Sequence, residues 1–354
     1  MAKQITWIIN DITQVGGIER VVCNLSNYFN DNKYKVKIIS LNTKSGKAYF
    51  KLSPQVIIQH FGYPADEILN RIKLKKAIRE LLKKENGNSD IIFTCHPWIA
   101  MPILQQRKLF KGKIICTDHS DWTHYSLKRR LLNVAYYRHA DRLVVLTDYA
   151  AHKYQRFGLE NIEIIPNIII SYPPKLSQLE SKELIAAGRL SYQKGFDRLI
   201  KAVDIIKDRM ADWHITIYGD GEDKEMLDSL IEQYQVNRQI SIAGFSDHLQ
   251  QKLQNCAGFI MSSHTEGLPM VALEALSNGV PIVGFDIPPL REIDHNSNNI
   301  IFAEQDNVND LADKILDYIK SKDKKSRGKQ SREISLRYSL ENIGPIWLNL
   351  IEML

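Results

Sequence analysis

The run Ser262–Ala275 has the sequence SSHTEGLPMVALEA. It contains two carboxylates and a glycine turn, which together could hold a polyhydroxylated anion. The run reads as a strand end, a turn at Gly267, a proline suited to a first helical turn, and a helix. The exposed N–H groups at such a helix start attract anions, and a diphosphate fits there. Glu266 precedes the helix, where it can accept hydrogen bonds from sugar hydroxyls. Glu274 lies roughly 7 Å further along the axis, a reach that suits the vicinal hydroxyls of a ribose.

Two further loops carry groups that fit a phosphate. Arg189 and Lys194 flank the sequence LSYQ between a predicted strand and a helix, where two cations would neutralise a diphosphate leaving group. Gly16 and Gly17 follow the first predicted strand and permit close backbone approach to phosphate or sugar. Each loop also has a plain interpretation, a solvated basic loop or a common Gly-Gly turn, so the Ser262–Ala275 run carries most of the argument.

A histidine-rich loop leaves two interpretations open. The spacing Asp118-His119-x-Asp121-x-x-His124 follows a predicted strand and is compatible with a metal site, and His96 follows another strand. No second cluster completes such a site. We therefore expect no bound metal, and His119 lining a ligand pocket and donating to a sugar hydroxyl explains the loop better.

The elements that must position these loops alternate between strands and helices. Strand–helix–strand alternation implies an α/β fold of parallel sheets with helices on both faces. It occurs twice, which predicts two Rossmann-like, doubly wound domains with a ligand cleft between the carboxyl ends of their sheets. The predicted parts are an N-terminal acceptor-binding domain, a Pro- and Ser-rich linker, a C-terminal nucleotide-binding domain, and a last helix packing back on the first domain, at residues 1–168, 169–182, 183–335 and 336–354.

Composition limits the class of protein. The chain has 354 residues, 44% hydrophobic and 25% charged, as expected for a globular protein with two cores. No stretch reaches the ~20 apolar residues of a membrane-spanning helix, and we read no secretory signal, so a cytoplasmic location is expected. The four scattered cysteines argue against disulfides or a cysteine-based zinc site. The net charge of +6 is mild, and no nucleic-acid-binding motif is present.

Two basic amphipathic segments could contact a membrane. Arg71–Lys84 has the sequence RIKLKKAIRELLKK, and Ser126–Arg142 adds five more cationic side chains. Such faces bind anionic lipid surfaces at the inner side of the cell membrane. A solvated outer face of a packed helix is the alternative.

The motifs together resemble the retaining glycosyltransferases of family four, which have the GT-B fold. The resemblance covers nearly the whole chain and is densest from Glu183 to Ile293, where EGLPMV, LEAL and GVPIV occur in order. Bacterial members that build capsule, exopolysaccharide or O-antigen look most similar. The resemblance implies transfer of a sugar from a nucleotide sugar, UDP-linked in our expectation, to a glycan or lipid-linked hydroxyl, with no cofactor beyond this donor.

The family pattern also implies roles for particular residues. Arg189 and Lys194 bind the diphosphate, Glu274 the ribose, and Glu266 the donor sugar, while His119 faces the transferred sugar. Further donor contacts fall on Gly16, Gly17, Gly219, Gly244, Phe245, Gly267, Leu268, Pro269, Met270 and Val271.

One departure from the family pattern leaves the donor open. Pro288-Pro289 stand where many relatives have a Gly pair. The sequence also leaves three other functions to weigh. These are a metal-dependent hydrolase using Asp118, His119, Asp121 and His124, an epimerase or phosphorylase on the same architecture, and a non-catalytic donor-binding subunit of a glycan assembly complex.

Overall fold

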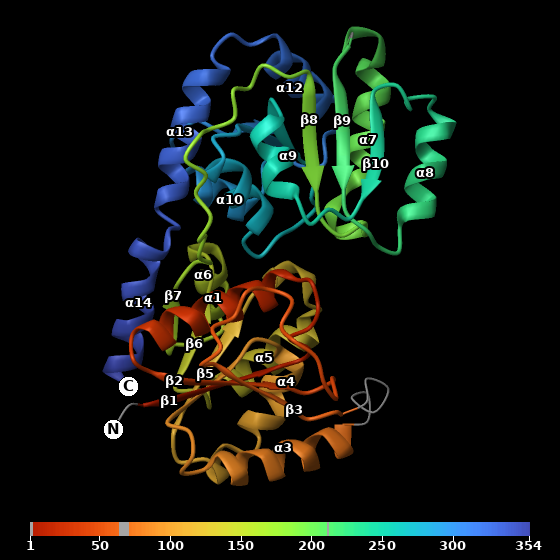
Figure 1. The fold of residues 1–354 in the computed structure, drawn as a ribbon. Coiled ribbons are helices and arrows are strands. Elements are labelled where there is room, and N and C mark those ends of the chain that lie inside the picture. Colours follow the sequence, from red (N-terminus) through yellow and green to blue (C-terminus); the bar gives the residue numbers. More distant parts are fainter. Residues whose placement is uncertain (1–2, 64–70, 211) are drawn as a thin grey trace. The chain divides into compact units, whose positions relative to one another are not determined.

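The computed structural model describes residues 3–63, 71–210 and 212–354. The chain divides into two compact units, one of Met1–Ile168 with Leu340–Leu354 and the other of Ile169–Ser339. Each is built on its own sheet (Figure 1). The expected α/β architecture of two Rossmann-like units is therefore confirmed.

The first unit contains a seven-stranded parallel sheet of order β3-β2-β1-β4-β5-β6-β7. Its strands are nearly continuous apolar runs, such as Ile91-Ile92-Phe93 at 2% exposure or less, because helices cover both faces. The strands are β1 (Gln4–Ile9), β2 (Lys35–Ser40), β3 (Ile57–His60), β4 (Ile91–Thr94), β5 (Lys113–Asp118), β6 (Arg142–Val145) and β7 (Ile162–Ile164). The helices are α1 (Gly17–Asp31), α3 (Arg71–Glu85), α4 (Pro97–Leu104), α5 (Leu127–Tyr137), α6 (Asp148–Gln155) and α14 (Leu340–Met353).

The last helix, α14, belongs to the first unit. Trp347 is 3% exposed, and its ring centroid lies 6.4 Å from that of Phe29 in α1 and 5.9 Å from that of Phe93 in β4. One turn further along the helix, Lys3 Nζ donates to the Ile351 carbonyl oxygen at 3.1 Å. The C-terminal residues thus complete the hydrophobic core that the N-terminal residues begin.

The second unit contains a six-stranded parallel sheet of order β10-β9-β8-β11-β12-β13. Figure 1 shows β8, β9 and β10 as adjacent arrows of this sheet. The strands are β8 (Glu183–Ala187), β9 (His214–Tyr218), β10 (Ile240–Gly244), β11 (Gly258–Met261), β12 (Ile282–Phe285) and β13 (Ile301–Ala303). The helices are α7 (Phe196–Ile206), α8 (Lys224–Gln233), α9 (Leu249–Asn255), α10 (Met270–Ser277), α11 (Pro288–Asp294), α12 (Val308–Lys320) and α13 (Lys324–Leu336).

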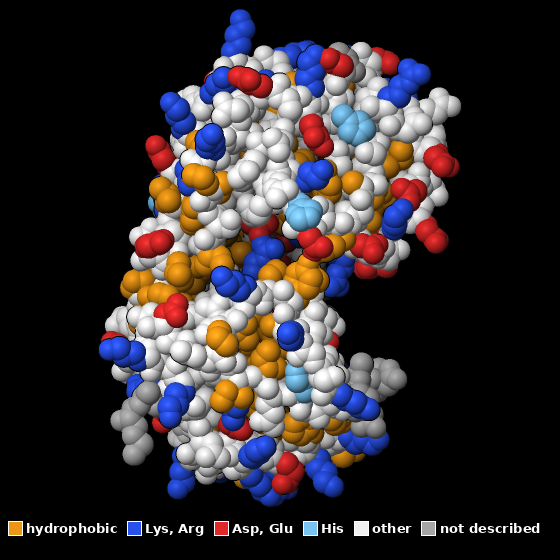
Figure 2. Space-filling view, viewed as in Figure 1, with side chains coloured by type: hydrophobic (Ala, Val, Ile, Leu, Met, Phe, Trp, Pro, Cys, Tyr) orange, Lys and Arg blue, Asp and Glu red, His pale blue; other side chains and the backbone are white. Residues whose placement is uncertain are grey.

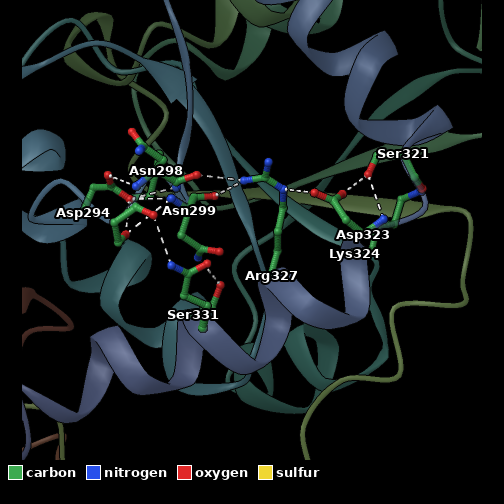
Figure 3. A network of polar contacts seen from close by, with 11 residues as sticks. Asp294, Asn298, Asn299, Ser321, Asp323, Lys324, Arg327 and Ser331 are labelled. Carbon is green, nitrogen blue, oxygen red and sulfur yellow. Dashed lines mark hydrogen bonds and ion pairs between the residues drawn. The ribbon is translucent and has the colours of Figure 1, made fainter.

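A buried carboxylate organises the turn between α11 and β13. Asp294, 3% exposed, accepts hydrogen bonds from the backbone N–H groups of Asn298, Asn299 and Ile300 at 2.9–3.0 Å. Figure 3 shows this turn linked to α13, where Arg327 donates to the Asn298 and Asn299 carbonyl oxygens at 3.0 Å. The turn contains three non-glycine residues with positive φ, His295, Asn296 and Asn298, so the network holds a backbone that most residues avoid.

Two expectations from composition can be checked directly. All four cysteines are buried and free, as their scattered positions indicated. Within residues 3–63, 71–210 and 212–354, no helix combines the length and apolar character needed to cross a bilayer.

Candidate active site

The predicted site residues of the second unit lie at the point in its sheet where the order of the strands reverses. The chain runs from β8 outward to β9 and β10, then returns to β11 on the other side of β8. Loops at the carboxyl ends of strands at such a switch point diverge and leave room for a ligand. The loop after β8 carries Arg189 and Lys194, and the loop after β11 carries Glu266.

Lys194 and Glu266 join these two loops in an ion pair. The Lys194 Nζ atom lies 2.7 Å from Glu266 Oε1, and their side chains are 19% and 7% exposed. Ser263 Oγ donates to the same carboxylate oxygen at 2.6 Å. Arg189, in contrast, is exposed, so the site has one cation that is already ordered by a carboxylate and one that faces solvent.

Hydrogen bonds to backbone carbonyl oxygens hold the two loops together. His264 N–H donates to the Gln193 carbonyl oxygen at 2.9 Å, and Gln193 Nε2 donates to the Thr265 carbonyl oxygen at 3.0 Å. Ser262 Oγ donates to the Lys194 carbonyl oxygen at 3.0 Å. These hydrogen bonds join the loop after β8 to the loop after β11, and we call the joined loops the junction. The junction holds Lys194 and Glu266 in a fixed geometry before a ligand binds.

Close backbone packing extends this junction toward β9 and β10. Gly219 has φ 154°, and a Cβ atom there would lie 1.8 Å from the Gly188 carbonyl oxygen. Gly219 N–H donates to the Gly244 carbonyl oxygen at 2.9 Å. Phe245 follows with 54% exposure. Gly219 and Gly244 are thus structurally constrained positions at the same edge of the sheet as the ion pair, and Phe245 offers an open aromatic surface there.

The run from Gly267 to Glu274 bends and then enters α10. Pro269 is the N-cap residue of α10, so the helix begins at Met270, one residue later than the sequence predicts. Leu268 is buried at 6% exposure, whereas Met270 and Val271 are partly exposed. Glu274, in the middle of this short helix, is 4% exposed.

The first unit presents its own switch point, between β1 and β4. Gly16 is the N-cap of α1, with an extended φ of −149°, and Gly17 is the first helical residue. A Cβ atom on Gly16 would lie 2.1 Å from Glu19 Oε2, because the buried Glu19 carboxylate folds back over the helix start, so a larger residue at this position would displace that carboxylate.

Two partly buried histidines stand at the carboxyl ends of β4 and β5. Burial lowers the pKa of His96 to about 4 and, with a contribution from His96, that of His119 to about 4. His119 Nε2 lies 3.0 Å from Thr117 Oγ1, and the Asn167 side chain also hydrogen-bonds to this imidazole. Both rings are neutral at pH 7, which suits hydrogen bonding to an uncharged hydroxyl.

The acidic side chains of the histidine-rich loop accept hydrogen bonds from other groups of the protein. Asp118 is 4% exposed and accepts from Tyr125 Oη at 3.2 Å, from Ser120 N–H at 3.1 Å and from Tyr154 Oη. Asp121 caps the following turn by accepting from Thr123 N–H at 2.5 Å. No three His, Cys, Asp or Glu side chains converge for a metal among the residues that the structure describes. The His124 side chain, which the metal interpretation needs, lies outside that description.

Several residues of the junction were not predicted from the sequence. Ser263 lies inside the quoted motif, but its contact with Glu266 spans a backbone bend at His264. Arg198, in the first turn of α7, is 6% exposed and donates to the Ser262 carbonyl oxygen at 2.5 Å. A buried arginine on an otherwise apolar helix face has no distinctive sequence signal, because arginine usually lies at the surface.

Two doubly wound sheets in tandem, with an ordered cation–carboxylate pair at one switch point, define a protein of the two-domain α/β type. Comparison with known proteins specifies it further. The family described as "Glycosyl transferases group 1" matches residues 171–334, and "Glycosyltransferase Family 4" matches residues 15–170. The protein AmsD of Erwinia amylovora, an amylovoran biosynthesis glycosyltransferase, is 30% identical over 79% of this chain and 80% of its own. The chain belongs to these glycosyltransferases.

Two other comparisons extend over the full length. An uncharacterised glycosyltransferase of Haemophilus influenzae is 27% identical over 99% of this chain and 100% of its own. The crystal structure of Staphylococcus aureus TarM, a variant in complex with fondaparinux, α-GlcNAc-glycerol and UDP, superimposes with a TM-score of 0.84 at 18% identity, covering 98% of this chain and 99% of that one. The latter likeness establishes that the GT-B fold is shared.

Proposed function

We propose that this glycosyltransferase is a retaining, metal-independent enzyme that transfers a sugar from a UDP-sugar to a hydroxyl of a glycan or lipid-linked acceptor in bacterial surface-polysaccharide synthesis. The observation that carries the proposal is the Lys194–Glu266 pair, 2.7 Å apart, at the switch point of the second unit. AmsD acts in amylovoran biosynthesis and the TarM structure contains UDP, which supports the acceptor class and the nucleotide.

In this proposal the cations act on the leaving group. The acceptor oxygen forms a bond to the anomeric carbon on the face from which the nucleotide leaves, and the bond from that carbon to the β-phosphate oxygen breaks. The acceptor proton passes to an oxygen of the departing diphosphate. Lys194 and Arg189 stabilise the negative charge that develops there.

The remaining residues bind the donor. Glu266 accepts hydrogen bonds from hydroxyls of the donor sugar, and the buried Glu274 accepts from the ribose, where exclusion of water strengthens each bond. Gly219, Gly244 and Phe245 lie near the nucleotide. In the first unit, Gly16 and Gly17 approach the donor and neutral His119 faces the transferred sugar.

The test is a turnover assay of the full chain with UDP-glucose, UDP-GlcNAc, UDP-galactose, GDP-mannose and ADP-glucose, each with and without EDTA. We expect slow release of UDP from one UDP-sugar at the same rate in EDTA, with the sugar transferred to water, and the α-anomer of the free sugar as the first product by proton NMR from an α-linked donor. An inverted product, loss of activity in EDTA, or a different nucleotide refutes the corresponding part of the proposal. Donor binding without any turnover supports instead the non-catalytic subunit.

Contact with a membrane is part of the proposal, since a lipid-linked acceptor requires it. On α3, Ile72 is 82% exposed beside exposed Lys73 and Lys76, and Figure 2 shows Lys and Arg side chains gathered where α3 runs in Figure 1. On α5, Leu127 and Leu131 are 62% and 51% exposed. Co-sedimentation with phosphatidylglycerol vesicles at physiological salt should capture the protein, and failure to bind would favour a soluble acceptor.

A further inference from the structure

An exposed aromatic ring stands in the middle of the cationic loop of the second unit. Tyr192 lies between Arg189 and Lys194, and its side chain is 74% exposed. One face of the ring stacks on the His264 imidazole, with ring centroids 4.4 Å apart and planes 14° from parallel. The high exposure leaves the opposite face open to solvent.

Contacts with Asp306 and Arg198 hold the His264 side of the stack in place. His264 Nδ1 lies 3.6 Å from Asp306 Oδ1, and the Arg198 guanidinium pairs with the same carboxylate. Burial, more than the nearby Arg198, lowers the pKa of His264, so the imidazole stacks as a neutral ring near pH 7.

Arg198 is itself held firmly. Its guanidinium carbon lies 4.1 Å from the centroid of the Phe285 ring in β12, and its Nη2 atom donates to the Ser262 carbonyl oxygen. The exposed tyrosine therefore rests on a chain of contacts that ends in the buried sheet. A ring that is ordered before binding loses little entropy when a ligand stacks on it.

The position of the ring indicates which part of a ligand it meets. Tyr192 is two residues before Lys194, within about 8 Å along the backbone. His264, on which the Tyr192 ring stacks, lies two residues before Glu266, to which we assign the donor sugar. A pyranose held by Glu266 therefore lies next to the loop that carries Tyr192.

We propose that the open face of Tyr192 is a stacking subsite for a pyranose ring, either of the donor sugar or of the acceptor glycan. The inference rests on the proposed function and adds a specificity determinant to it. A flat aromatic face packs against the C–H bonds on one face of a sugar ring, and the tyrosine hydroxyl is not needed for that contact.

The kinetic test compares Tyr192→Ala with Tyr192→Phe in the full chain. We expect Tyr192→Ala to raise KM about five- to tenfold for the substrate that stacks, with kcat changed less than twofold, and Tyr192→Phe to match the unmodified enzyme. A rise in the donor KM assigns the ring to the donor, and a rise in the acceptor KM assigns it to the acceptor. Tyr234→Ala, a partly buried tyrosine after α8, is the matched control and should change neither KM.

A binding measurement keeps the inference testable without turnover. Saturation-transfer NMR with millimolar methyl α-glucoside and methyl α-N-acetylglucosaminide should show transfer to the ring protons, reduced at least threefold by Tyr192→Ala. Equal transfer and equal KM values in the unmodified protein and the folded Tyr192→Ala variant would overturn the subsite. Absence of turnover by the unmodified enzyme, with this loss of transfer intact, would overturn the proposed function alone.

Discussion

Replacing Lys194 by methionine should destabilise the second unit, because it leaves a buried carboxylate without its cation. Glu266 is 7% exposed, and after the substitution its Oε1 atom retains the hydrogen bond from Ser263. At 2.7 Å and an effective dielectric constant of about 20, the lost attraction is about 6 kcal/mol before desolvation is counted. Breaking a fully buried pair costs about 3–5 kcal/mol and an exposed pair about 0.2–1 kcal/mol. With Lys194 at 19% exposure, we expect the free energy of unfolding to fall by about 2–3 kcal/mol.

The assay is thermal unfolding of the full chain followed by circular dichroism. A loss of this size lowers Tm by about 4–12 °C for a unit of this length. Lys201→Met is the matched control, because Lys201 pairs with Asp197 at 3.0 Å on α7 with side chains 44% and 25% exposed. It should lower Tm by no more than about 2 °C.

A second substitution separates charge from packing. Adding Glu266→Gln to Lys194→Met removes the uncompensated charge, so the double variant should unfold at a higher temperature than Lys194→Met alone. If Lys194→Met is no less stable than Lys201→Met, or if Glu266→Gln gives no recovery, the pair does not stabilise the junction as argued.

Three further perturbations test the remaining geometry. Asp294→Ala should lower the free energy of unfolding by about 2–4 kcal/mol in urea titration, because buried backbone N–H groups lose their acceptor; a change below 1 kcal/mol would contradict this. Gly219→Ala should abolish soluble expression or lower Tm by more than 5 °C, since Gly188 occupies the Cβ position; a Tm within about 2 °C of the unmodified protein would count against the described packing. His96 and His119 fold with pKa values of about 4, below the unfolded value of about 6.5, so their stabilising contribution is complete above pH 6.5 and is lost as pH falls toward 4. The pH dependence of unfolding over that window should flatten in His96→Phe, and an unchanged slope would show that His96 does not titrate there.

Elements with an ordinary apolar pattern could be predicted closely from the sequence. A short apolar run marks the strand Gly258–Met261, and apolar residues four positions apart, Leu227 and Ile231, mark the helix Lys224–Gln233. The helix α13, Lys324–Leu336, cannot be recognised in this way, because its first half is rich in charged residues and shows no apolar period. Its buried positions are Gly328, Ser331, Ile334 and Ser335, and small polar residues that pack against α10 leave little apolar periodicity to read.

In the candidate site, too, some residues could be predicted from the sequence, whereas their contacts could not. Lys194 and Glu266 could be selected because their motifs are dense and specific, but their direct contact depends on pairing between loops 72 residues apart in the sequence. The support from Arg198 depends on contacts with residues 64 and 108 positions away. Such contacts are set by the order of strands in the sheet, which local sequence patterns do not encode.

The switch points of the two units differ in charge, and this difference indicates which unit can bind a diphosphate and which can bind an uncharged sugar. The edge of the second unit carries Arg189 and Lys194, of which the latter is ordered by Glu266, so it can hold a diphosphate and the charge that develops on it. The described edge of the first unit carries His96 and His119, which are neutral at pH 7 because burial lowers their pKa values to about 4. A neutral imidazole can donate to or accept from a sugar hydroxyl but cannot stabilise a phosphate by charge. It follows that affinity for the nucleotide should reside in the second unit, while the first unit can select among uncharged sugars without competing for the leaving group.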